Sequence, residues 1–209
     1  MSTPATIPFD RLARTALFVQ QILKDNHFSF SLLGGFQLQA MGSPRGTQDV
    51  DFVVKRPFFR GVDKIYHAFS EHPDTFKVIP VTIKDEIRII CVTEGVGVDI
   101  LIQELPESLD QICIAVDEKE EVMPCFPMQS MVFKKINCLA VRIEGSDLTD
   151  LEWLHDNCQH EITWSKIAAK VKQSGDIEKA VKNFPTETHP FMAKLLEVLG
   201  IDDQVSAQK

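Results

Sequence analysis

The chain has 209 residues, of which 44% are hydrophobic and 25% are charged, and its formal net charge is −8. This length and composition predict a globular protein with a sizeable core, built as one large domain or as a core with a smaller appendage. The acidic balance argues against an extended DNA-binding groove, because such grooves need clustered Lys and Arg side chains. A pocket for a small anionic ligand such as a nucleotide needs only local cations, so this class of ligand remains open.

The first half of the chain alternates between helical and strand patterns. Apolar residues at helical spacing predict a first helix over about residues 8–25. The segments that follow are a strand, a glycine break, a short helix, a loop and a second strand: 27–33, Gly34-Gly35, 36–41, 42–48 and 49–54. Next come a helix, three strands (the last two joined by a turn at Glu94-Gly95) and two edge pieces: 60–72, 76–81, 87–93, 96–103, 112–116 and 121–126.

After Pro127 every predicted element is a helix. The segment 128–145 fits a helix that ends at Gly145, and Ser146 is a suitable cap for the helix that follows. Helical spacing then continues over three more segments: 164–173, 176–184 and 189–200.

These patterns predict an α/β (α+β) core over residues 1–126, a helical region over residues 127–209 and a frayed polar tail from residue 202.

The five cysteines are odd in number and have no CxxC pair, which indicates free thiols in a reducing compartment rather than disulfides or a zinc site. No stretch is long and apolar enough to span a bilayer, and the first ten residues lack the features of a secretory signal. We therefore expect a cytoplasmic protein with no membrane contact.

Two aspartates in the second predicted strand raise a physical problem. Asp49 and Asp51 are two residues apart, so they point to the same face, with their Cα atoms roughly 7 Å apart. Like charges repel, and carboxylates resist burial unless something compensates them. One or two Mg²⁺ ions, with the remaining ligands supplied by a triphosphate, would resolve the conflict.

A third carboxylate lies in a later strand. Asp99 stands between Val98 and Ile100 in an apolar segment and again requires a partner. Arg88 and Lys84 are possible salt-bridge partners, which is the structural alternative to a role for Asp99 in a metal site.

The order of these residues resembles a known superfamily. An apolar strand, Gly34-Gly35, a short helix, Asp49-Val50-Asp51 and then Asp99 is similar to the pattern of the nucleotidyltransferases typified by DNA polymerase β. The stretch from Arg45 through Thr47 to Asp51 resembles the R-x-T-x-D-x-D motif of the AbiEii-like and MenT-like branch, known as toxins of bacterial toxin–antitoxin systems. The resemblance implies a mixed sheet flanked by helices and followed by a helical bundle.

A second motif extends the resemblance to about residue 155. In the AbiEii-like branch, a helix with a central Lys precedes K-D-L-x-D-L; here Lys134 and Lys135 precede Ser146-Asp147-Leu148-Thr149-Asp150-Leu151. Ser146 stands where the family has Lys, so this match is imperfect. Because Lys134 and Lys135 are adjacent on a helix, they face different directions, and at most one is expected to face a pocket.

The resemblance implies a role for each matching residue. Asp49, Asp51 and Asp99 would bind Mg²⁺ or Mn²⁺, and Asp99 would also help to deprotonate the acceptor. Gly34 and Gly35 lack side chains, so the backbone can approach phosphates closely. Arg45 and either Lys134 or Lys135 would neutralise the triphosphate, Thr47 would hydrogen-bond near the motif or to the nucleotide, and Asp150 would orient Lys135 or contact the acceptor.

Two functions from different classes follow. The first is an enzyme that transfers a nucleoside monophosphate from an NTP to a hydroxyl or amine and releases pyrophosphate. The acceptor would be a small molecule, a protein side chain or an RNA end such as that of tRNA. The second is a non-catalytic module of the same fold that binds a nucleotide, or binds a protein through its C-terminal helices. The sequence defines neither base preference, acceptor, oligomeric state nor a paired antitoxin.

Overall fold

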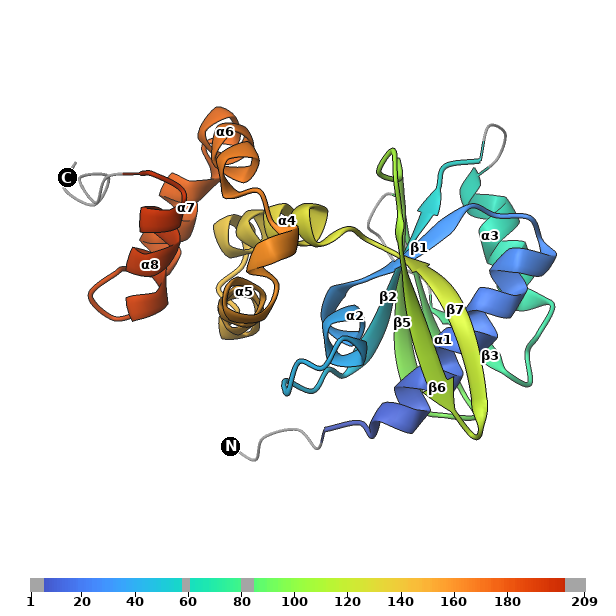
Figure 1. Ribbon diagram of the computed structural model, residues 1–209. Helices are drawn as coiled ribbons and strands as arrows, with labels where there is room; N and C mark the ends of the chain where they lie inside the picture. The colour runs from blue at the N-terminus through green and yellow to red at the C-terminus, as the bar shows by residue number, and fades with distance from the viewer. Residues whose placement is uncertain (1–5, 58–60, 80–84, 202–209) are drawn as a thin grey trace. The chain divides into compact units, whose positions relative to one another are not determined.

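The computed structural model describes residues 6–57, 61–79 and 85–201. The chain divides into two compact units, Met1–Pro127 and Met128–Lys209. The first unit contains the sheet and the second is helical (Figure 1). The predicted α/β class, with a mixed sheet flanked by helices and followed by helices, is confirmed.

The sheet of the first unit mixes parallel and antiparallel strands. Its strands are β1 (Phe30–Leu33), β2 (Asp49–Lys55), β3 (Phe76–Ile79), β4 (Glu86–Cys91), β5 (Val96–Gln103), β6 (Asp110–Val116) and β7 (Lys119–Cys125). Within the described residues they form one seven-stranded sheet in the order β3-β4-β5-β2-β1-β7-β6. The pairs β1/β7 and β2/β5 are parallel, and the other neighbours are antiparallel.

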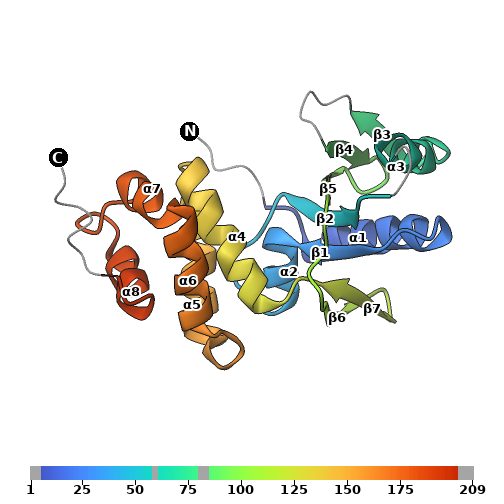
Figure 2. The same cartoon turned by 90° about the horizontal axis from the view of Figure 1, so that it is seen from above.

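The helices of the first unit are α1 (Phe9–Asp25), α2 (Gly34–Ala40) and α3 (Gly61–Ser70). Figures 1 and 2 show α1 and α3 on one face of the sheet and α2 on the other. Strand alternation produces this division. Val50 and Phe52 of β2, and Val98 of β5, belong to the fully buried core with α1. The intervening residues of β2 and β5 therefore point to the face on which α2 lies.

The second unit consists of α4 (Met128–Val141), α5 (Gly145–Asn157), a short 3₁₀ turn (Gln159–Glu161), α6 (Trp164–Ser174), α7 (Asp176–Asn183) and α8 (Pro190–Val198). The helix α4 contacts α5, α6 and α7. Its buried face includes Val132, Ile136 and Leu139, at the spacing of an amphipathic helix. Gly175, at φ 68°, ends α6 and allows the sharp turn into α7.

Three local predictions were wrong. The segment 121–126 was expected at an edge, but β7 lies between β1 and β6; of the two predicted edge pieces, β6 alone ends the sheet. Gly145 does not end the long helix: α4 stops at Val141, and Gly145 begins α5. Ser146 consequently lies inside the first turn of α5, where Glu144 holds the N-cap position without a side-chain cap.

Some expectations fall outside the described residues, namely Lys84, the end of the strand predicted over 76–81, and the tail from residue 202. All five cysteines are free thiols, and only Cys113 is exposed. Across the ranges that the structure describes, no helix combines the length and apolar character needed to cross a bilayer.

Candidate functional site

The strands β2 and β5 bring three carboxylates to one face of the sheet. In this parallel pair, Asp49 lies opposite Gly97 and Asp51 lies opposite Asp99. Paired residues of neighbouring strands are about 4.8 Å apart and point the same way. Asp49, Asp51 and Asp99 are all partly buried, whereas Val50 and Val98 beside them are fully buried on the opposite face.

Gly34 lies directly against the carboxylate of Asp51. It has φ +80°, and a Cβ atom at this position would overlap Asp51 Oδ2. A side chain here would meet both a strained backbone and the acidic group. The predicted glycine break is thus the junction between β1 and α2, because the helix begins at Gly34 itself.

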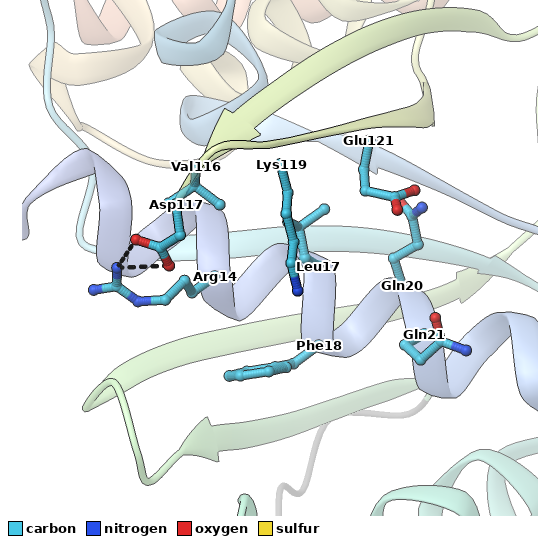
Figure 3. A pocket seen from close by; sticks show the side chains of 9 residues that line it. All are labelled: Arg14, Leu17, Phe18, Gln20, Gln21, Val116, Asp117, Lys119 and Glu121. Atoms are coloured by element: carbon cyan, nitrogen blue, oxygen red, sulfur yellow. Dashed lines mark hydrogen bonds and ion pairs between the residues drawn. The ribbon is translucent and has the colours of Figure 1, made fainter.

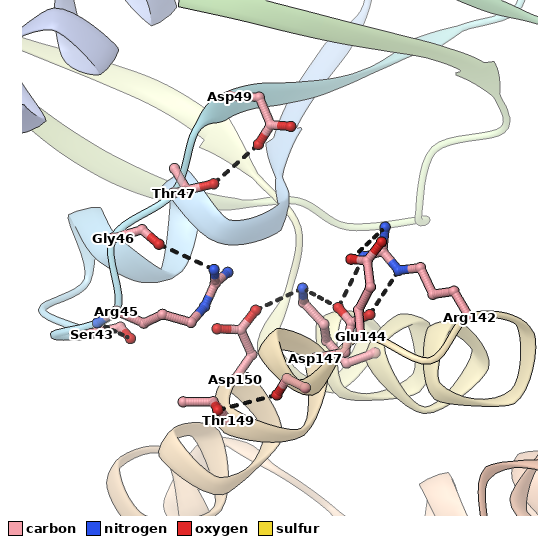
Figure 4. Close-up of polar contacts among 12 residues, drawn as sticks. Ser43, Arg45, Gly46, Thr47, Asp49, Arg142, Glu144, Asp147, Thr149 and Asp150 are labelled. Atoms are coloured by element: carbon pink, nitrogen blue, oxygen red, sulfur yellow. Dashed lines mark hydrogen bonds and ion pairs between the residues drawn. The ribbon is translucent and has the colours of Figure 1, made fainter. Parts of the chain in front are cut away.

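The loop before β2 is held by contacts of its own side chains (Figure 4). Thr47 is 5% exposed, and its hydroxyl donates a 3.0 Å hydrogen bond to Asp49 Oδ1. The guanidinium of Arg45 donates to the carbonyl of Gly46 at 3.1 Å. A Cβ at Gly35 would come within 2.6 Å of Arg45 Nη2 and 2.8 Å of Thr47 Oγ1, so this glycine allows the loop to pack on α2.

Asp99 lies in an electrostatic environment that disfavours its charged form. Its Oδ1 atom is buried and finds no hydrogen-bond donor among the described residues. Burial raises the pKa of Asp99; the charge of Arg88 opposes this shift, while Asp49 and Glu86 add to it. Arg88 Nε lies 3.4 Å from Asp99 Oδ1, so the salt bridge considered from the sequence does form.

The three carboxylates fit a hard divalent cation, because Mg²⁺ and Mn²⁺ prefer oxygen ligands. Asp99 Oδ1 is buried and has no hydrogen-bond donor among the described residues, so it is available as such a ligand. Within the described part of the chain, however, no group of three or more His, Cys, Asp or Glu side chains forms a ready-made metal cluster. This is compatible with Mg²⁺, which usually binds through one or two carboxylates and completes its shell with water and substrate phosphates.

The second unit holds a separate buried ion cluster. Lys135 Nζ on α4 lies 2.8 Å from Asp147 Oδ1 and 2.7 Å from Asp150 Oδ2 on α5 (Figure 4). The three residues are 6%, 0% and 1% exposed, respectively. Arg142 Nε also donates to Asp147 Oδ2, at 2.8 Å.

These contacts determine the ionisation of the cluster. Burial opposes the charge of Lys135, but Asp150 and Asp147 outweigh it and raise the Lys135 pKa. Burial likewise opposes ionisation of Asp147, but the cations Arg142 and Lys135 lower its pKa. The charge of Lys135 is therefore compensated inside the second unit. Asp150 contacts Lys135, and such a contact is needed if Asp150 is to orient Lys135. Lys134, the next residue of α4, is half-buried.

The first unit also has a surface pocket that does not include Asp49, Asp51 or Asp99. It lies between α1 and the β6–β7 hairpin (Figure 3), and its lining includes Arg14, Phe18 and Lys119. Arg14 pairs with Asp117 of the pocket lining at 3.2 Å, and also with Glu94 outside the lining at 3.0 Å. None of the carboxylates of β2 or β5 lines this pocket.

The sequence analysis did not identify two residues that lie beside the carboxylates of β2 and β5 or beside the buried ion cluster. Gly97 lies on β5 opposite Asp49 and leaves that part of the sheet face without a side chain. A glycine inside an apolar strand, two residues before Asp99, was the available signal. Arg142 pairs with Asp147 five residues later, but Arg142 lies in the connection after α4 and Asp147 in the first turn of α5, so helical spacing did not show the contact.

No protein-family model matches the chain, and no curated protein matches its sequence. The fold is similar to that of an antigenic nucleotidyltransferase-like protein from Paracoccidioides brasiliensis, with TM-score 0.56 and 16% identity over 93% of this chain and 95% of that one. It is also similar to JHP933 from Helicobacter pylori, with TM-score 0.50 and 14% identity over 94% of each chain. These similarities support a nucleotidyltransferase-like fold, but not the narrower AbiEii-like and MenT-like branch.

Proposed function

We propose that this protein is a divalent-metal-dependent nucleotidyltransferase, which moves a nucleoside monophosphate from an NTP to a hydroxyl or amine and releases pyrophosphate. The observation that carries the proposal is the in-register pairing of Asp51 with Asp99, with Asp49 on the same sheet face. A half-buried cluster of like charges is costly unless a cation or a substrate compensates it. The nucleotidyltransferase-like fold is consistent with this chemistry.

Each residue of the first unit has a defined task in this proposal. Asp49, Asp51 and Asp99 hold Mg²⁺ or Mn²⁺, which when bound neutralises phosphate charge and activates the acceptor oxygen. Thr47 fixes the orientation of Asp49 through its 3.0 Å hydrogen bond. Asp99 is suited to accept a proton from the acceptor, because burial raises its pKa and its Oδ1 accepts no hydrogen bond from the described residues.

The contacts of the three candidate cations rank them as ligands of the triphosphate. Arg45 remains the proposed phosphate ligand of the loop before β2, supported by its position beside Thr47 and Gly35. Lys135 is a weaker candidate than the sequence indicated, because two carboxylates already compensate its charge. Lys134 keeps the role that the resemblance implies.

The acceptor is proposed only by class: a small molecule, a protein side chain or an RNA end such as that of tRNA. A toxin-like role is one version of this enzyme, as the resemblance of the Arg45–Asp51 motif to the AbiEii-like and MenT-like toxins implies. A cytoplasmic location is consistent with the free thiols of all five cysteines.

The test is to incubate the purified chain with Mg²⁺, each α-labelled NTP and a panel of acceptors that includes tRNA and the chain itself. We expect pyrophosphate release and transfer of label with at least one combination, and loss of both in Asp49→Asn. Asp110→Asn, which changes an exposed carboxylate of β6, serves as the control and should leave activity unchanged. Mg-NTP binding without turnover in any combination would instead support a nucleotide-binding module.

A further inference from the structure

Arg88 is held close to the proposed metal ligands by the register of the sheet. It lies on β4 directly opposite Asp99 on β5, in an antiparallel pair. Its Nε atom is 3.4 Å from Asp99 Oδ1, yet that oxygen has no hydrogen-bond donor among the described residues. The contact is therefore an attraction between charges rather than a directional bond, and the Arg88 side chain is 49% exposed.

The guanidinium also lies close to Gly97, the residue of β5 that pairs with Asp49. A Cβ atom at Gly97 would lie 3.8 Å from Arg88 Nη2 and 3.9 Å from Asp49 Cβ. Gly97 stands between these groups on the same sheet face, so the missing side chain gives the guanidinium room beside the carboxylates. A cation of the protein thus lies next to Asp99, where the proposed function requires a divalent cation.

We propose that Arg88 is an exchangeable counter-ion of the carboxylate site. In the absence of metal, Arg88 compensates Asp99; when a divalent cation binds to Asp99, it repels the guanidinium and replaces it as the counter-ion, so the guanidinium moves away from Asp99. The displaced guanidinium then faces the triphosphate, which offers it a new anionic partner. Arg88 therefore weakens metal binding to the empty site and favours joint binding of metal and NTP. This regulation rests on the proposed function.

A purely structural salt bridge is the competing explanation. Exposed or half-exposed pairs across neighbouring strands contribute little to stability, and many are interchangeable with other polar pairs. A structural pair would be expected to hold Asp99 in place, so its removal would leave metal affinity unchanged or reduce it. Only the counter-ion role therefore predicts that removal of Arg88 increases metal affinity.

The experiment is calorimetric titration of Mn²⁺ into the wild-type chain, Arg88→Gln and Arg88→Lys, without nucleotide and with saturating non-hydrolysable NTP. The control is Arg56→Gln, because Arg56 is also 49% exposed and pairs with Asp85 at 2.6 Å, outside the carboxylate site. Thermal unfolding of each variant checks that it is folded.

Without nucleotide, we expect Arg88→Gln to bind Mn²⁺ roughly three- to tenfold more tightly, since a solvent-screened repulsion is removed. The gain in Mn²⁺ affinity caused by NTP should shrink in Arg88→Gln, while Arg88→Lys and Arg56→Gln should resemble the wild type. Equal or weaker Mn²⁺ binding by Arg88→Gln would overturn the counter-ion role. If Arg88→Gln did not bind Mn²⁺ more tightly but pyrophosphate release still depended on Asp49, the proposed function would stand without the counter-ion role. If neither the wild type nor Arg88→Gln bound Mn²⁺, both proposals would fail.

Discussion

Asp51 on β2 lies directly opposite Asp99 on β5, so two carboxylates occupy paired positions of neighbouring parallel strands. Most sheets avoid like charges in directly opposite positions, because the pair destabilises the sheet. Here the aspartates also alternate with fully buried Val50, Phe52 and Val98, which fixes the face to which they point. The arrangement places an electrostatic cost in the centre of the sheet, where a bound cation would relieve it.

The first prediction concerns how much the charged carboxylate of Asp99 destabilises the folded protein when no metal is bound. Its raised pKa means that the folded chain binds a proton at Asp99 more readily than the unfolded chain does. Protonated Asp99 therefore contributes to the free energy of unfolding below the ordinary aspartate pKa of 3.8. This contribution is lost as the pH rises through the raised pKa of Asp99 in the folded chain. Without metal at pH 7, Asp99→Asn should therefore melt a few degrees higher than the wild type, and this advantage should shrink as the pH falls towards 4.

Thermal unfolding of both proteins from pH 7 to pH 4, with and without Mg²⁺, checks this prediction. Mg²⁺ should raise the melting temperature of the wild type but not that of Asp99→Asn. A variant that melts below the wild type at pH 7 would indicate that the attraction of Arg88 outweighs burial.

The second prediction uses the contact of Gly34 with Asp51. Gly34→Ala introduces a Cβ that overlaps the carboxylate and also strains a backbone at φ +80°. We expect a stability loss of about 1–3 kcal/mol from the strain and at least a tenfold loss of Mn²⁺ affinity from displacement of Asp51. Gly42→Ala is the matched control, because φ is +101° and no atom lies within 4 Å of the added Cβ. It should lose stability but keep its metal affinity, as measured by denaturant unfolding and calorimetry.

The third prediction concerns the hydrogen bond between Thr47 and Asp49. Thr47→Val keeps the shape of the side chain but removes the donor to Asp49 Oδ1. Metal affinity should fall about tenfold, as is typical when a group that orients a ligand is lost. Thr47→Ser retains the hydroxyl and should restore most of the affinity. Equal Mn²⁺ titrations of wild type and Thr47→Val would show that this hydrogen bond does not orient a metal ligand.

The fourth prediction concerns the buried ion cluster of the second unit. Lys135→Met leaves Asp150 buried without the 2.7 Å contact to Lys135 and should cost roughly 3–5 kcal/mol. In the double variant Lys135→Met, Asp150→Leu, the remaining Asp147 still pairs with Arg142, so much of the loss should be recovered. Lys179→Met, which removes an exposed Lys that pairs with a partly buried Asp176 at 3.5 Å, should change the free energy of unfolding by less than about 0.5 kcal/mol.

Denaturant unfolding of the wild type and the three variants measures these differences. If the double variant were no more stable than Lys135→Met, the cluster would owe its stability to more than charge compensation.

Local sequence patterns were sufficient where one residue type decides the structure. The alternation around Val50 and Phe52 predicted β2 and the common face of Asp49 and Asp51. The apolar spacing of residues 8–25 predicted α1 to within a residue at its start. The pairing of Asp51 with Asp99 depended on the order of strands, and only the resemblance to nucleotidyltransferases suggested that β5 would lie beside β2.

Features that depend on contacts between distant segments could not be predicted from local patterns. The strand β7 pairs in parallel with β1 through Leu32 and Cys125, and no pattern within residues 119–125 distinguishes this position from an edge. Lys135 looked like a cation available to phosphate, because the sequence does not show that Asp147 and Asp150 of the next helix bury it. The 3.4 Å approach of Arg88 to Asp99 likewise follows from strand register rather than from spacing.

The most direct test of the central claim is an equilibrium titration of Mn²⁺ in the presence of each non-hydrolysable NTP, on the wild type and on Asp49→Asn, Asp51→Asn and Asp99→Asn. The account predicts saturable, nucleotide-dependent binding by the wild type, and at least a tenfold loss of affinity in each folded variant. Binding that is absent from the wild type with all four nucleotides, or that is unchanged in all three variants, would contradict it.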